Sequence, residues 1–464
     1  MDKSTMEGAN NLVCFECTQL IEPESKIVHR LRRTYCRDCW IHHCNFRFRK
    51  RLFELGRPEK GSRIPANLLG AKENVLIDYD GSQSAIALVH LIRDAVRSAA
   101  EAANLPDQKN LPLPFTFSIL FIHDDLIGNE TSLKQLDVLR KWQTNTFYRY
   151  GLQFPIIVSS LETSLRVLEG RIGENEFIWR AISSQSVQDV EGNGAHGRIE
   201  ELDPLPYTFP FNSPLTSRLT LIADSFRSKT CRQDFLQELR QNLLLFICKQ
   251  LSVKRILVSE EQTCMAIKMF SMMSLGRGAQ LAEQMSLTTQ IQGVKLARPL
   301  MDLAQDDLRD YMECIYEQEK RTAAATEESF KPLSLPIDNT KNGKTVRAKT
   351  KTIYQQCEDF IVDLQKGYPS TVPTLTRIGA KLRPTDYGEP SCNANAEGMA
   401  RPTGGSQTDA TSFSPLTSVC SFCKKNRNDT EDQESHQLCL CYGCTNILRD
   451  MKDQSYFREL IQPM

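Results

Sequence analysis

The chain has 464 residues, 40% hydrophobic and 25% charged, which is the composition of an ordinary globular protein with room for two or more domains. Its formal net charge is +0, so no whole-protein field favours nucleic acid and any such contact has to be local. No apolar run reaches the roughly 18 residues of a membrane-spanning helix, and the polar N-terminal stretch has no signal-peptide core. We therefore expect a cytoplasmic protein that makes no membrane contact.

The first element in chain order is a pair of CxxC turns. Cys14 and Cys17 form one turn, and Cys36 and Cys39 form the other after eighteen intervening residues. Tetrahedral zinc binds four thiolates at about 2.3 Å, and each turn supplies two. In a reducing compartment this spacing indicates metal and not a disulfide framework. We predict a zinc site at these four residues; the alternative is four buried free cysteines.

Other side chains near the first cluster are also possible metal ligands. They are His29, His42, His43 and Cys44. Four cysteines already complete a tetrahedral site, so we expect these residues to be bystanders. Exchange of Cys44 for Cys39 as a ligand is left open.

A basic segment with interleaved aromatic residues overlaps this cluster. Residues 26–57 contain ten Lys or Arg residues and two acidic residues. Within "NFRFRKRLFELGR", Arg47, Arg49, Lys50 and Arg51 are placed to bind a phosphate backbone, with aromatic rings available for stacking. The alternative is a solvated basic face whose aromatic residues form the core of a small domain. We predict that these four residues bind RNA.

The middle of the chain alternates strand-like and helix-like segments. Strand-like runs occupy residues 74–80, 115–125, 152–160 and 255–260, and helix-like runs occupy residues 82–104, 131–151, 231–251 and 263–275. Such alternation predicts an α/β fold, a doubly wound parallel sheet with helices on both faces.

Composition suggests where this α/β domain begins and ends. We place an N-terminal zinc module at residues 1–60, the α/β domain at 70–380, a disordered linker at 381–415 and a C-terminal zinc module at 416–464. Within the α/β domain, residues 187–197 are expected to be an insertion loop and residues 317–351 a mobile polar segment.

The first predicted strand meets its helix through the turn "DYDGSQS", residues 78–84. A helix that starts in such a place directs N–H groups and its positive dipole end at a ligand, usually a phosphate. This turn has one glycine, Gly81, and two carboxylates, Asp78 and Asp80. Two unit charges about 4 Å apart repel by ~4 kcal/mol at an effective dielectric constant of 20. The turn is therefore expected to be a former nucleotide site, with an ordinary strand-to-helix turn as the alternative, and no ATP is expected on this chain.

Other acidic residues end strands at the edge where such sheets bind ligands. His123, Asp124 and Asp125 follow the second strand, and no basic residue accompanies them in sequence. Glu260 and Glu261 follow the fourth strand, where a helix-start cap is the expected role. Neither group rescues a nucleotide site.

The second cysteine cluster lies at the other end of the chain. Cys420, Cys423, Cys441 and Cys444 repeat the paired arrangement, with Cys439 left over. We predict a second zinc site; an iron–sulfur cluster is the alternative, because four thiolates can also hold one. The cysteines that occur singly in helix-like segments are expected to be small core residues: Cys231, Cys248, Cys264, Cys314 and Cys357.

Several short motifs occur in a recognisable order: "YCRDCW", "FRFRKRL", "DGSQS", "SLGRGAQLAEQ", "ARPLMDL" and "CLCYGC". Together they resemble the cytoplasmic tRNA 2-thiolation protein 2 family, the second subunit of the cytosolic thiouridylase complex. The "DGSQS" turn stands in the place of the Ser-Gly-Gly-x-Asp-Ser pyrophosphate loop of related ATP-using thiolases. Gly81 keeps the first glycine. The positions that depart from the loop are Asp80 for the first serine, Ser82 for the second glycine, Ser84 for the aspartate and Ala85 for the last serine.

The resemblance implies a fold of the adenine-nucleotide-hydrolase type with a degenerate loop. It also implies a non-catalytic role in 2-thiolation of wobble uridine, position 34, in cytoplasmic tRNAs for Lys, Glu and Gln. The implied partners are a catalytic thiolase subunit of the same fold, as a heterodimer, and a thiocarboxylated ubiquitin-related modifier as sulfur carrier. Whether the chain is itself an enzyme stays open. The alternatives are an ATP-dependent thiolase active by itself and a zinc-dependent adaptor in ubiquitin-type conjugation without RNA.

Overall fold

The structure is a computed structural model. It describes residues 12–21, 27–30, 33–56, 73–103, 115–124, 129–170, 180–182, 214–322, 351–382, 419–425, 439–455 and 457–458. The expected insertion loop at 187–197 and most of the expected mobile segment and linker lie outside these ranges. None of the helices in these ranges is long and apolar enough to cross a membrane.

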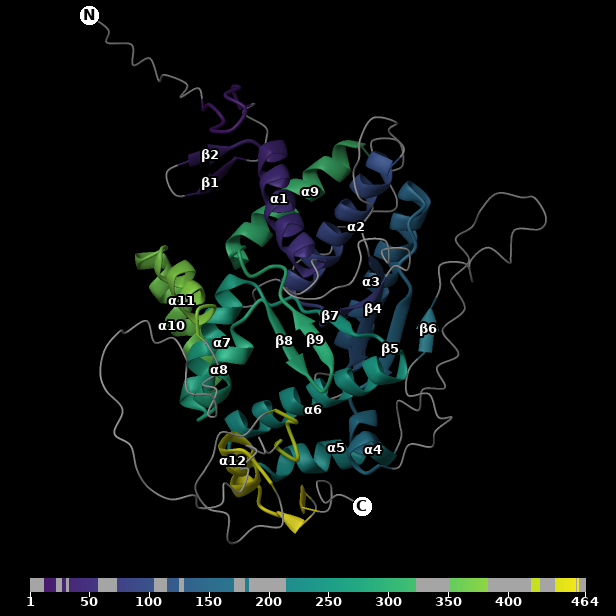
Figure 1. Cartoon of the computed structure of the whole chain (residues 1–464), viewed down its shortest axis with the longest axis vertical. Coiled ribbons are helices and arrows are strands. Elements are labelled where there is room, and N and C mark those ends of the chain that lie inside the picture. Colours follow the sequence, from purple (N-terminus) through teal and green to yellow (C-terminus); the bar gives the residue numbers. More distant parts are fainter. Residues whose placement is uncertain are drawn as a thin grey trace, which may run out of the picture.

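A seven-stranded sheet forms the centre of the molecule (Figure 1). Its strands, with a small N-terminal hairpin of two more, are β1 (Val28–Arg30), β2 (Arg33–Tyr35), β3 (Glu73–Tyr79), β4 (Phe115–His123), β5 (Ile156–Ser160), β6 (Arg180–Ile182), β7 (Arg255–Leu257), β8 (Thr288–Ile291) and β9 (Val294–Ala297). The strand order in the sheet is β6-β5-β4-β3-β7-β9-β8. The five central strands are parallel, which confirms the predicted parallel sheet, whereas β6 and β8 pair antiparallel at the two edges.

The helices follow the strands as the alternation predicts. They are α1 (Arg37–Gly56), α2 (Gln83–Ala103), α3 (Asn129–Tyr150), α4 (Thr163–Leu168), α5 (Pro214–Ser225), α6 (Lys229–Gln250), α7 (Gln262–Ser274), α8 (Leu281–Gln284), α9 (Gln305–Thr322), α10 (Ile353–Gly367), α11 (Thr371–Gly379) and α12 (Tyr442–Asp450). The four helix-like segments of the sequence correspond to α2, α3, α6 and α7.

The order of the strands creates a topological switch point. From β3 the chain builds β4 and β5 on one side, and it then returns to place β7 and β9 on the other side of β3. At such a point the two connections leave in opposite directions, which opens a crevice at the carboxyl edge of the strands. The "DGSQS" turn follows β3 and therefore lies at this crevice.

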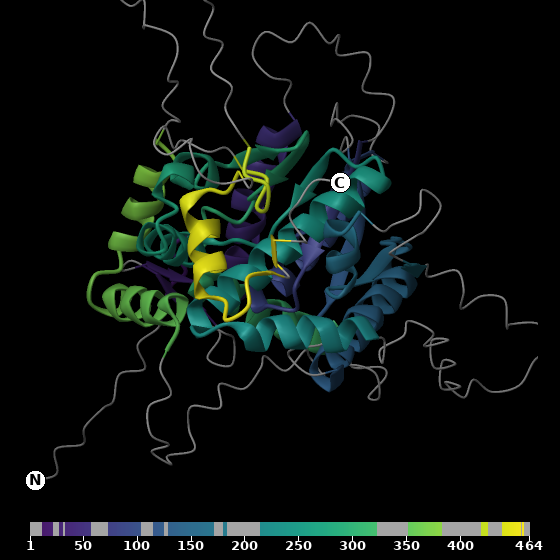
Figure 2. The same cartoon turned by 90° about the horizontal axis from the view of Figure 1, so that it is seen from below.

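Each face of the sheet is covered by its own hydrophobic cluster. Residues of α1, α2, α3 and α9 bury one face, where Ile77 and Ile119 are fully buried. Residues of α4, α5, α6 and the C-terminal segment bury the other, where Leu76 and Leu120 point. Adjacent residues of β3 and β4 thus serve opposite faces, as the two-residue period of a strand requires. Figures 1 and 2 show the C-terminal segment, drawn in yellow, against α6.

Both cysteine-rich ends are packed onto this body. α1 contributes Trp40, Phe48 and Leu52 to the same cluster as α2 and α9. The C-terminal segment contributes Phe422 and Phe457 to the cluster around α6. Neither end has a separate hydrophobic core among the described residues, so the two metal-site candidates are parts of one folded body.

Candidate metal centres and the strand-edge loop

The first four predicted ligands converge. The sulfur atoms of Cys14, Cys17, Cys36 and Cys39 all lie within 4.8 Å of one another. The backbone N–H of Cys36 donates to the Cys14 sulfur at 3.3 Å, and Thr18, just after the first CxxC turn, has a left-handed φ of 58°. Although burial opposes it, backbone N–H donors lower the pKa of the Cys14 thiol to about 6. A thiol with such a pKa is readily available as the thiolate that a metal binds.

The second four ligands repeat this geometry. The sulfur atoms of Cys420, Cys423, Cys441 and Cys444 also lie within 4.8 Å of one another. The backbone N–H of Cys441 donates to the Cys420 sulfur at 3.3 Å. Lys424, just after this first CxxC turn, has a left-handed φ of 60°. A non-glycine residue accepts this conformation only where the surroundings require it, so the same knuckle is built twice from unrelated stretches of sequence.

The spacing of the sulfur atoms suits a single ion. The sulfur atoms of Cys17 and Cys36 are 3.9 Å apart and those of Cys423 and Cys441 are 3.8 Å apart. Four thiolates at about 2.3 Å from one tetrahedral ion lie about 3.8 Å from each other. In an iron–sulfur cluster the four thiolates are shared among two or four irons, which places thiolates of different irons further apart than the ligands of one ion. Both groups are therefore able to hold one tetrahedral metal ion.

The spare ligand candidates have other roles. The His29 ring bonds to the Thr34 hydroxyl at 3.2 Å, and the His43 ring stacks on Trp40 at a centroid distance of 5.3 Å. Cys44 is buried in the core beside α9, and burial raises the pKa of its thiol. Cys439 is exposed and lies outside the second group. None of them joins a metal-binding group among the described residues.

One residue that contacts the C-terminal cluster was not predicted from the sequence. Arg277 lies between α7 and α8, and its guanidinium is within 3.9 Å of the Cys441 sulfur and 3.8 Å of the Cys444 sulfur. Its motif, "SLGRGAQ", is one of those that carry the family resemblance. The sequence contains that signal, but only the fold places this motif against "CYGC".

The strand-edge loop satisfies its own backbone. The Asp80 carboxylate accepts the N–H of Ser82 at 2.9 Å, and the Ser82 hydroxyl accepts the N–H of Ala85 at 3.1 Å. Gly81 has a φ of +75°, and a Cβ built on it would lie 2.4 Å from the side chain of Gln135 on α3. The loop's own side chains therefore occupy N–H groups that a phosphate would need, and the α3 side chain covers the glycine.

Asp78 does not face that loop as a free carboxylate. It forms a bidentate ion pair with Arg240 of α6, with N–O distances of 2.7 and 2.6 Å. Burial opposes the charge of Arg240, yet the carboxylates of Asp78, Asp80 and Asp124 raise its pKa. The expectation that no basic residue accompanies Asp124 is therefore wrong in three dimensions, because α6 brings Arg240 from a distant part of the sequence. Asp125 lies outside the described residues.

The two glutamates after β7 separate in role. Glu261 is the N-cap of α7 and accepts the backbone N–H of Cys264 at 2.7 Å and that of Thr263, which confirms the predicted cap. Glu260 is not a cap. It pairs with Lys268 and with Arg298, a fully buried arginine that follows β9. Sequence position alone did not distinguish them, because the partners of Glu260 come from α7 and from the loop after β9.

The basic residues of α1 are in unequal surroundings. Arg51 pairs with Asp302 and Glu54, and the Arg49 guanidinium bonds to the Ser98 hydroxyl at 2.5 Å. Arg47 and Lys50 are exposed, and Arg47 donates to the carbonyl oxygen of Asp302 at 3.0 Å. Arg49 and Arg51 therefore join α1 to the body, Arg47 does so through one hydrogen bond while staying exposed, and Lys50 is exposed. Of the aromatic residues between them, Phe48 is buried, whereas Phe46 and Phe53 are exposed.

The singly occurring cysteines only partly match the expected core role. Cys248 and Cys314 are buried, as predicted. Cys231 and Cys357 are half-buried, and Cys264 is exposed, so the expectation is wrong for Cys264. Its position in the first turn of α7 places it at the end of the helix and not on the packed face.

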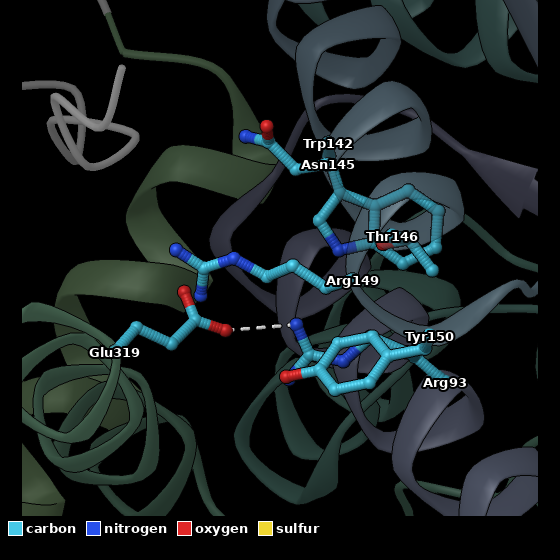
Figure 3. Close-up of a pocket in the computed structure, with 7 residues that line it drawn as sticks. All are labelled: Arg93, Trp142, Asn145, Thr146, Arg149, Tyr150 and Glu319. Atoms are coloured by element: carbon cyan, nitrogen blue, oxygen red, sulfur yellow. Dashed lines mark hydrogen bonds and ion pairs between the residues drawn. The ribbon is translucent and has the colours of Figure 1, made fainter. Parts of the chain in front are cut away.

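One hollow lies away from the metal centres and the loop, and another lies beside the C-terminal cysteine group. The first, between α2, α3 and α9, has a volume of about 10 Å³ and is closed by the Arg93–Glu319 ion pair at 2.8 Å (Figure 3). That volume holds about one water molecule and no larger ligand. The second is a groove of about 470 Å³ beside α12, lined among others by Asp234, Gly276 and Tyr442.

Comparisons with known proteins agree on one family. The model of the family described as "Cytoplasmic tRNA 2-thiolation protein 2" matches residues 352–446, which include α10, α11 and the C-terminal thiolates. Proteins of that name are similar to this chain in Anopheles gambiae (22% identity, covering 97% of this chain and 95% of the relative), Drosophila persimilis (24%, 75% and 67%) and Homo sapiens (23%, 79% and 67%).

Among solved structures, the chain is similar to "U34-tRNA thiolase NcsA from Methanococcus maripaludis with its [4Fe-4S] cluster". The TM-score is 0.42 at 13% identity, over 83% of this chain and 92% of that chain. At this level the fold assignment rests on the sheet topology of the chain itself. The Anopheles gambiae relative extends along nearly the whole chain, and the family model covers the C-terminal cysteines. By these comparisons the chain is similar to the cytoplasmic tRNA 2-thiolation protein 2 family, whose model matches its C-terminal part.

Proposed function

We propose that this chain is a non-catalytic subunit of the cytoplasmic complex that 2-thiolates wobble uridine 34 in tRNAs for Lys, Glu and Gln. Similarity to the family supports the role in tRNA 2-thiolation. The observation that carries the non-catalytic part is the strand-edge loop, where Asp80 and Ser82 bond to the loop's own N–H groups. The α/β fold is of the adenine-nucleotide-hydrolase type, with this loop in the place of the pyrophosphate loop.

The loop lacks what ATP activation requires. Activation of a carbonyl oxygen by ATP depends on positioning the phosphates and neutralising their charge. Here a carboxylate, Asp80, holds an amide at the place where a phosphate would bind, and Gln135 covers Gly81. A carboxylate close to a phosphate disfavours binding by several kcal/mol at ~4 Å. Catalysis therefore belongs to a partner subunit of the same fold, which binds this chain as a heterodimer.

Both cysteine groups are proposed to hold zinc. Cys14, Cys17, Cys36 and Cys39 make one site, and Cys420, Cys423, Cys441 and Cys444 make the other. A tetrahedral four-thiolate set that is closed by protein ligands is the usual arrangement of structural zinc. Bound zinc would tie each CxxC turn to the helix that follows it, α1 or α12, and would supply no chemistry to a substrate.

Of the predicted residues Arg47, Arg49, Lys50 and Arg51, the exposed Arg47 and Lys50 are proposed to bind the tRNA backbone, with Arg49 and Arg51 supporting α1. Arg47 and Lys50 are exposed and available, and Arg49 and Arg51 hold α1 in place through contacts with Ser98 and Asp302. A helix fixed in this way presents its charges at constant spacing, which suits phosphate contacts. Sulfur would reach the complex on the thiocarboxylate of a ubiquitin-related modifier.

The decisive experiment measures 2-thiouridine in tRNA from cells that lack this chain. We expect the modification to disappear and to return with the wild-type gene. Ser82→Ala and Ser84→Ala should restore it fully, because a degenerate loop does no chemistry, whereas an inactive variant of the partner thiolase should not. A loss with Ser82→Ala as deep as that of the inactive partner would show that this chain is itself the enzyme.

Two binding measurements separate the remaining alternatives. The isolated, metal-loaded chain should bind no ATP at millimolar nucleotide in calorimetry, and binding would favour a self-sufficient ATP-dependent thiolase. The native complex, purified from cells, should contain the partner thiolase and tRNA. Protein partners of a ubiquitin-type conjugation system without RNA, together with normal 2-thiouridine in the deletion strain, would favour the adaptor instead.

A further inference from the structure

Arg277 joins two segments that are far apart in the sequence. Its Nη1 atom lies 3.9 Å from the Cys441 sulfur, and Nη1 and Nη2 each lie 3.8 Å from the Cys444 sulfur. The side chain is 4% exposed. It crosses directly over Gly443, where a Cβ would come within 2.8 Å of the guanidinium carbon. The glycine inside "CYGC" thus makes room for the arginine of "SLGRGAQ".

Two carboxylates of α6 fix the guanidinium. Asp234 accepts from Nη2 at 2.8 Å, and Glu238 lies 3.4 Å from Nη1. Glu238 also pairs with Lys425, which follows the first CxxC turn, at 2.8 and 3.0 Å. The acidic side of α6 therefore holds two cations, one from the body and one from the C-terminal segment, next to the four sulfur atoms.

Charge explains why this site needs such cations. Four thiolates and one divalent ion carry a net charge of about −2, and a buried charge without partners is costly. All four sulfur ligands of the C-terminal group are buried, whereas three of the four N-terminal ligands are half-exposed and can be hydrated. In the part of the chain that the structure describes, no arginine donates to the N-terminal sulfur atoms. The two sites share one geometry and differ in how their charge is compensated.

We propose that Arg277 is a positioning residue for the C-terminal metal site and that it couples metal retention to docking of α12 on α6. Its N–H groups stabilise the thiolates of Cys441 and Cys444 and hold the turn that carries them. Loss of the metal leaves the turn from Cys441 to Cys444 without the ion that holds its sulfur atoms beside the guanidinium. Loss of the guanidinium leaves the buried thiolates uncompensated and weakens the metal. The N-terminal site is independent of this residue.

The first test displaces the arginine without touching a charge or a ligand. In the full, zinc-loaded chain, Gly443→Ala pushes a methyl group into the Arg277 side chain, whereas Gly278→Ala, in the same loop as Arg277, meets open space. Zinc release to excess chromogenic chelator is followed, and alkylation with peptide mass spectrometry identifies which cysteines become reactive. Since removal of an outer-shell partner costs about 10–100-fold in metal affinity, we expect at least a tenfold faster release from the C-terminal site in Gly443→Ala only.

A second pair of variants removes the guanidinium itself. Arg277→Met is compared with Arg93→Met, because Arg93 is 5% exposed and pairs with Asp94 and Glu319 but contacts no sulfur. Arg277→Met should speed release from the C-terminal site alone and raise the hydrogen exchange of α12 amides. Arg277→Lys should restore part of the zinc retention at the C-terminal site, since lysine keeps the positive charge but not the two-pronged N–H geometry of the guanidinium.

The outcomes decide between positioning and ordinary packing. Unchanged zinc release in a folded Arg277→Met or Gly443→Ala protein overturns the proposal. Equal acceleration in Arg93→Met also overturns it, because the effect would then be general destabilisation. Should Arg277→Met not fold, Gly443→Ala carries the test with all charges in place. None of these readouts depends on tRNA thiolation, so the proposed function is tested separately.

Discussion

At the scale of single residues, charges that look exposed in the sequence are paired in the structure. Asp78 and Asp80 are two residues apart, yet Asp78 faces α6 and pairs with Arg240, whereas Asp80 bonds to the loop backbone. The two-residue period of a strand does not extend through the turn, so their different directions follow from the end of β3 at Tyr79.

Arg240→Met should destabilise the protein by about 2–3 kcal/mol, because it leaves a nearly buried carboxylate without its partner. The side chain of Asp78 is only 12% exposed. Urea unfolding measures the change. In the double variant with Asp78→Asn, the loss should be smaller than the sum of the two single losses, and strictly additive losses would show that the ion pair contributes no coupling.

Glu261 should make stability depend on pH. Burial raises the pKa of its carboxyl from 4.5 to about 7. Between these values the unfolded chain has lost the proton while the native state still holds it, so the free energy of unfolding falls as pH rises from about 4.5 to 7, by roughly 3 kcal/mol. Urea unfolding of wild type and Glu261→Gln at pH 5 and pH 8 should show a flatter dependence in the variant.

The matched control for this pH effect is Glu358→Gln, on the exposed side of α10. It should keep the wild-type slope. Glu260 titrates in a separate range. Burial opposes ionisation of its carboxyl, but Lys268 and Arg298 lower its pKa to about 2. The stability that this carboxylate contributes is therefore lost only as pH falls below about 4.5. A wild-type slope in Glu261→Gln would mean that this carboxyl is ionised throughout.

At the scale of elements, the two cysteine modules share one knuckle but differ in burial. The N-terminal module contacts the body mainly through α1, whose Phe48 and Leu52 pack near α9. Arg30 of its hairpin also pairs with Asp307 of α9 at 2.7 Å. In the C-terminal module, the four cysteines of the candidate metal site belong to the hydrophobic cluster around α6, next to Phe235 and Phe422, whose rings stack at 5.6 Å.

Removal of one ligand from each module should therefore have different consequences. Cys17→Ser and Cys423→Ser should each lower the zinc content by about one ion of two, measured by elemental analysis. Cys423→Ser should also reduce the free energy of unfolding by more than about 3 kcal/mol, because it opens a buried cluster. Cys17→Ser should leave the α/β domain folded. Full zinc content in either variant would contradict the assignment of that site.

At the scale of the whole molecule, α1 carries two exposed cations in a chain with no net charge. Arg47 and Lys50 point to solvent on the helix that links the N-terminal hairpin to the body. Because the total charge is zero, a binding surface for RNA has to come from such local placement.

Arg47→Ala with Lys50→Ala should weaken tRNA binding by the purified complex. Two lost phosphate contacts should reduce the slope of log affinity against log salt by about 1.4–1.8, equally for all tRNA sequences. The control pair, Lys254→Ala with Lys366→Ala, removes two exposed charges elsewhere and should leave the slope unchanged. An unchanged slope with loss of the partner subunit would identify α1 as a protein interface.

The amino-acid sequence by itself determined the local features of this protein. The CxxC spacings identified both groups of four converging cysteines, and the alternation of apolar runs identified β3, β4, β5 and β7 with the helices α2, α3, α6 and α7. These features are local because a knuckle, a strand or a helix is set by residues within a few positions of one another. The helix cap formed by Glu261 is also such a local feature.

Only the tertiary structure decided which distant charges meet. The pairs Asp78–Arg240, Glu260–Arg298 and Arg277–Asp234 join residues that lie 162, 38 and 43 positions apart. Short edge strands such as β6 and β8 also escaped prediction, because three or four residues carry too little periodicity. Contact between Arg277 and the Cys441–Cys444 turn required the packing of α12 on α6, which no local pattern encodes, since many chain paths can join the same segments.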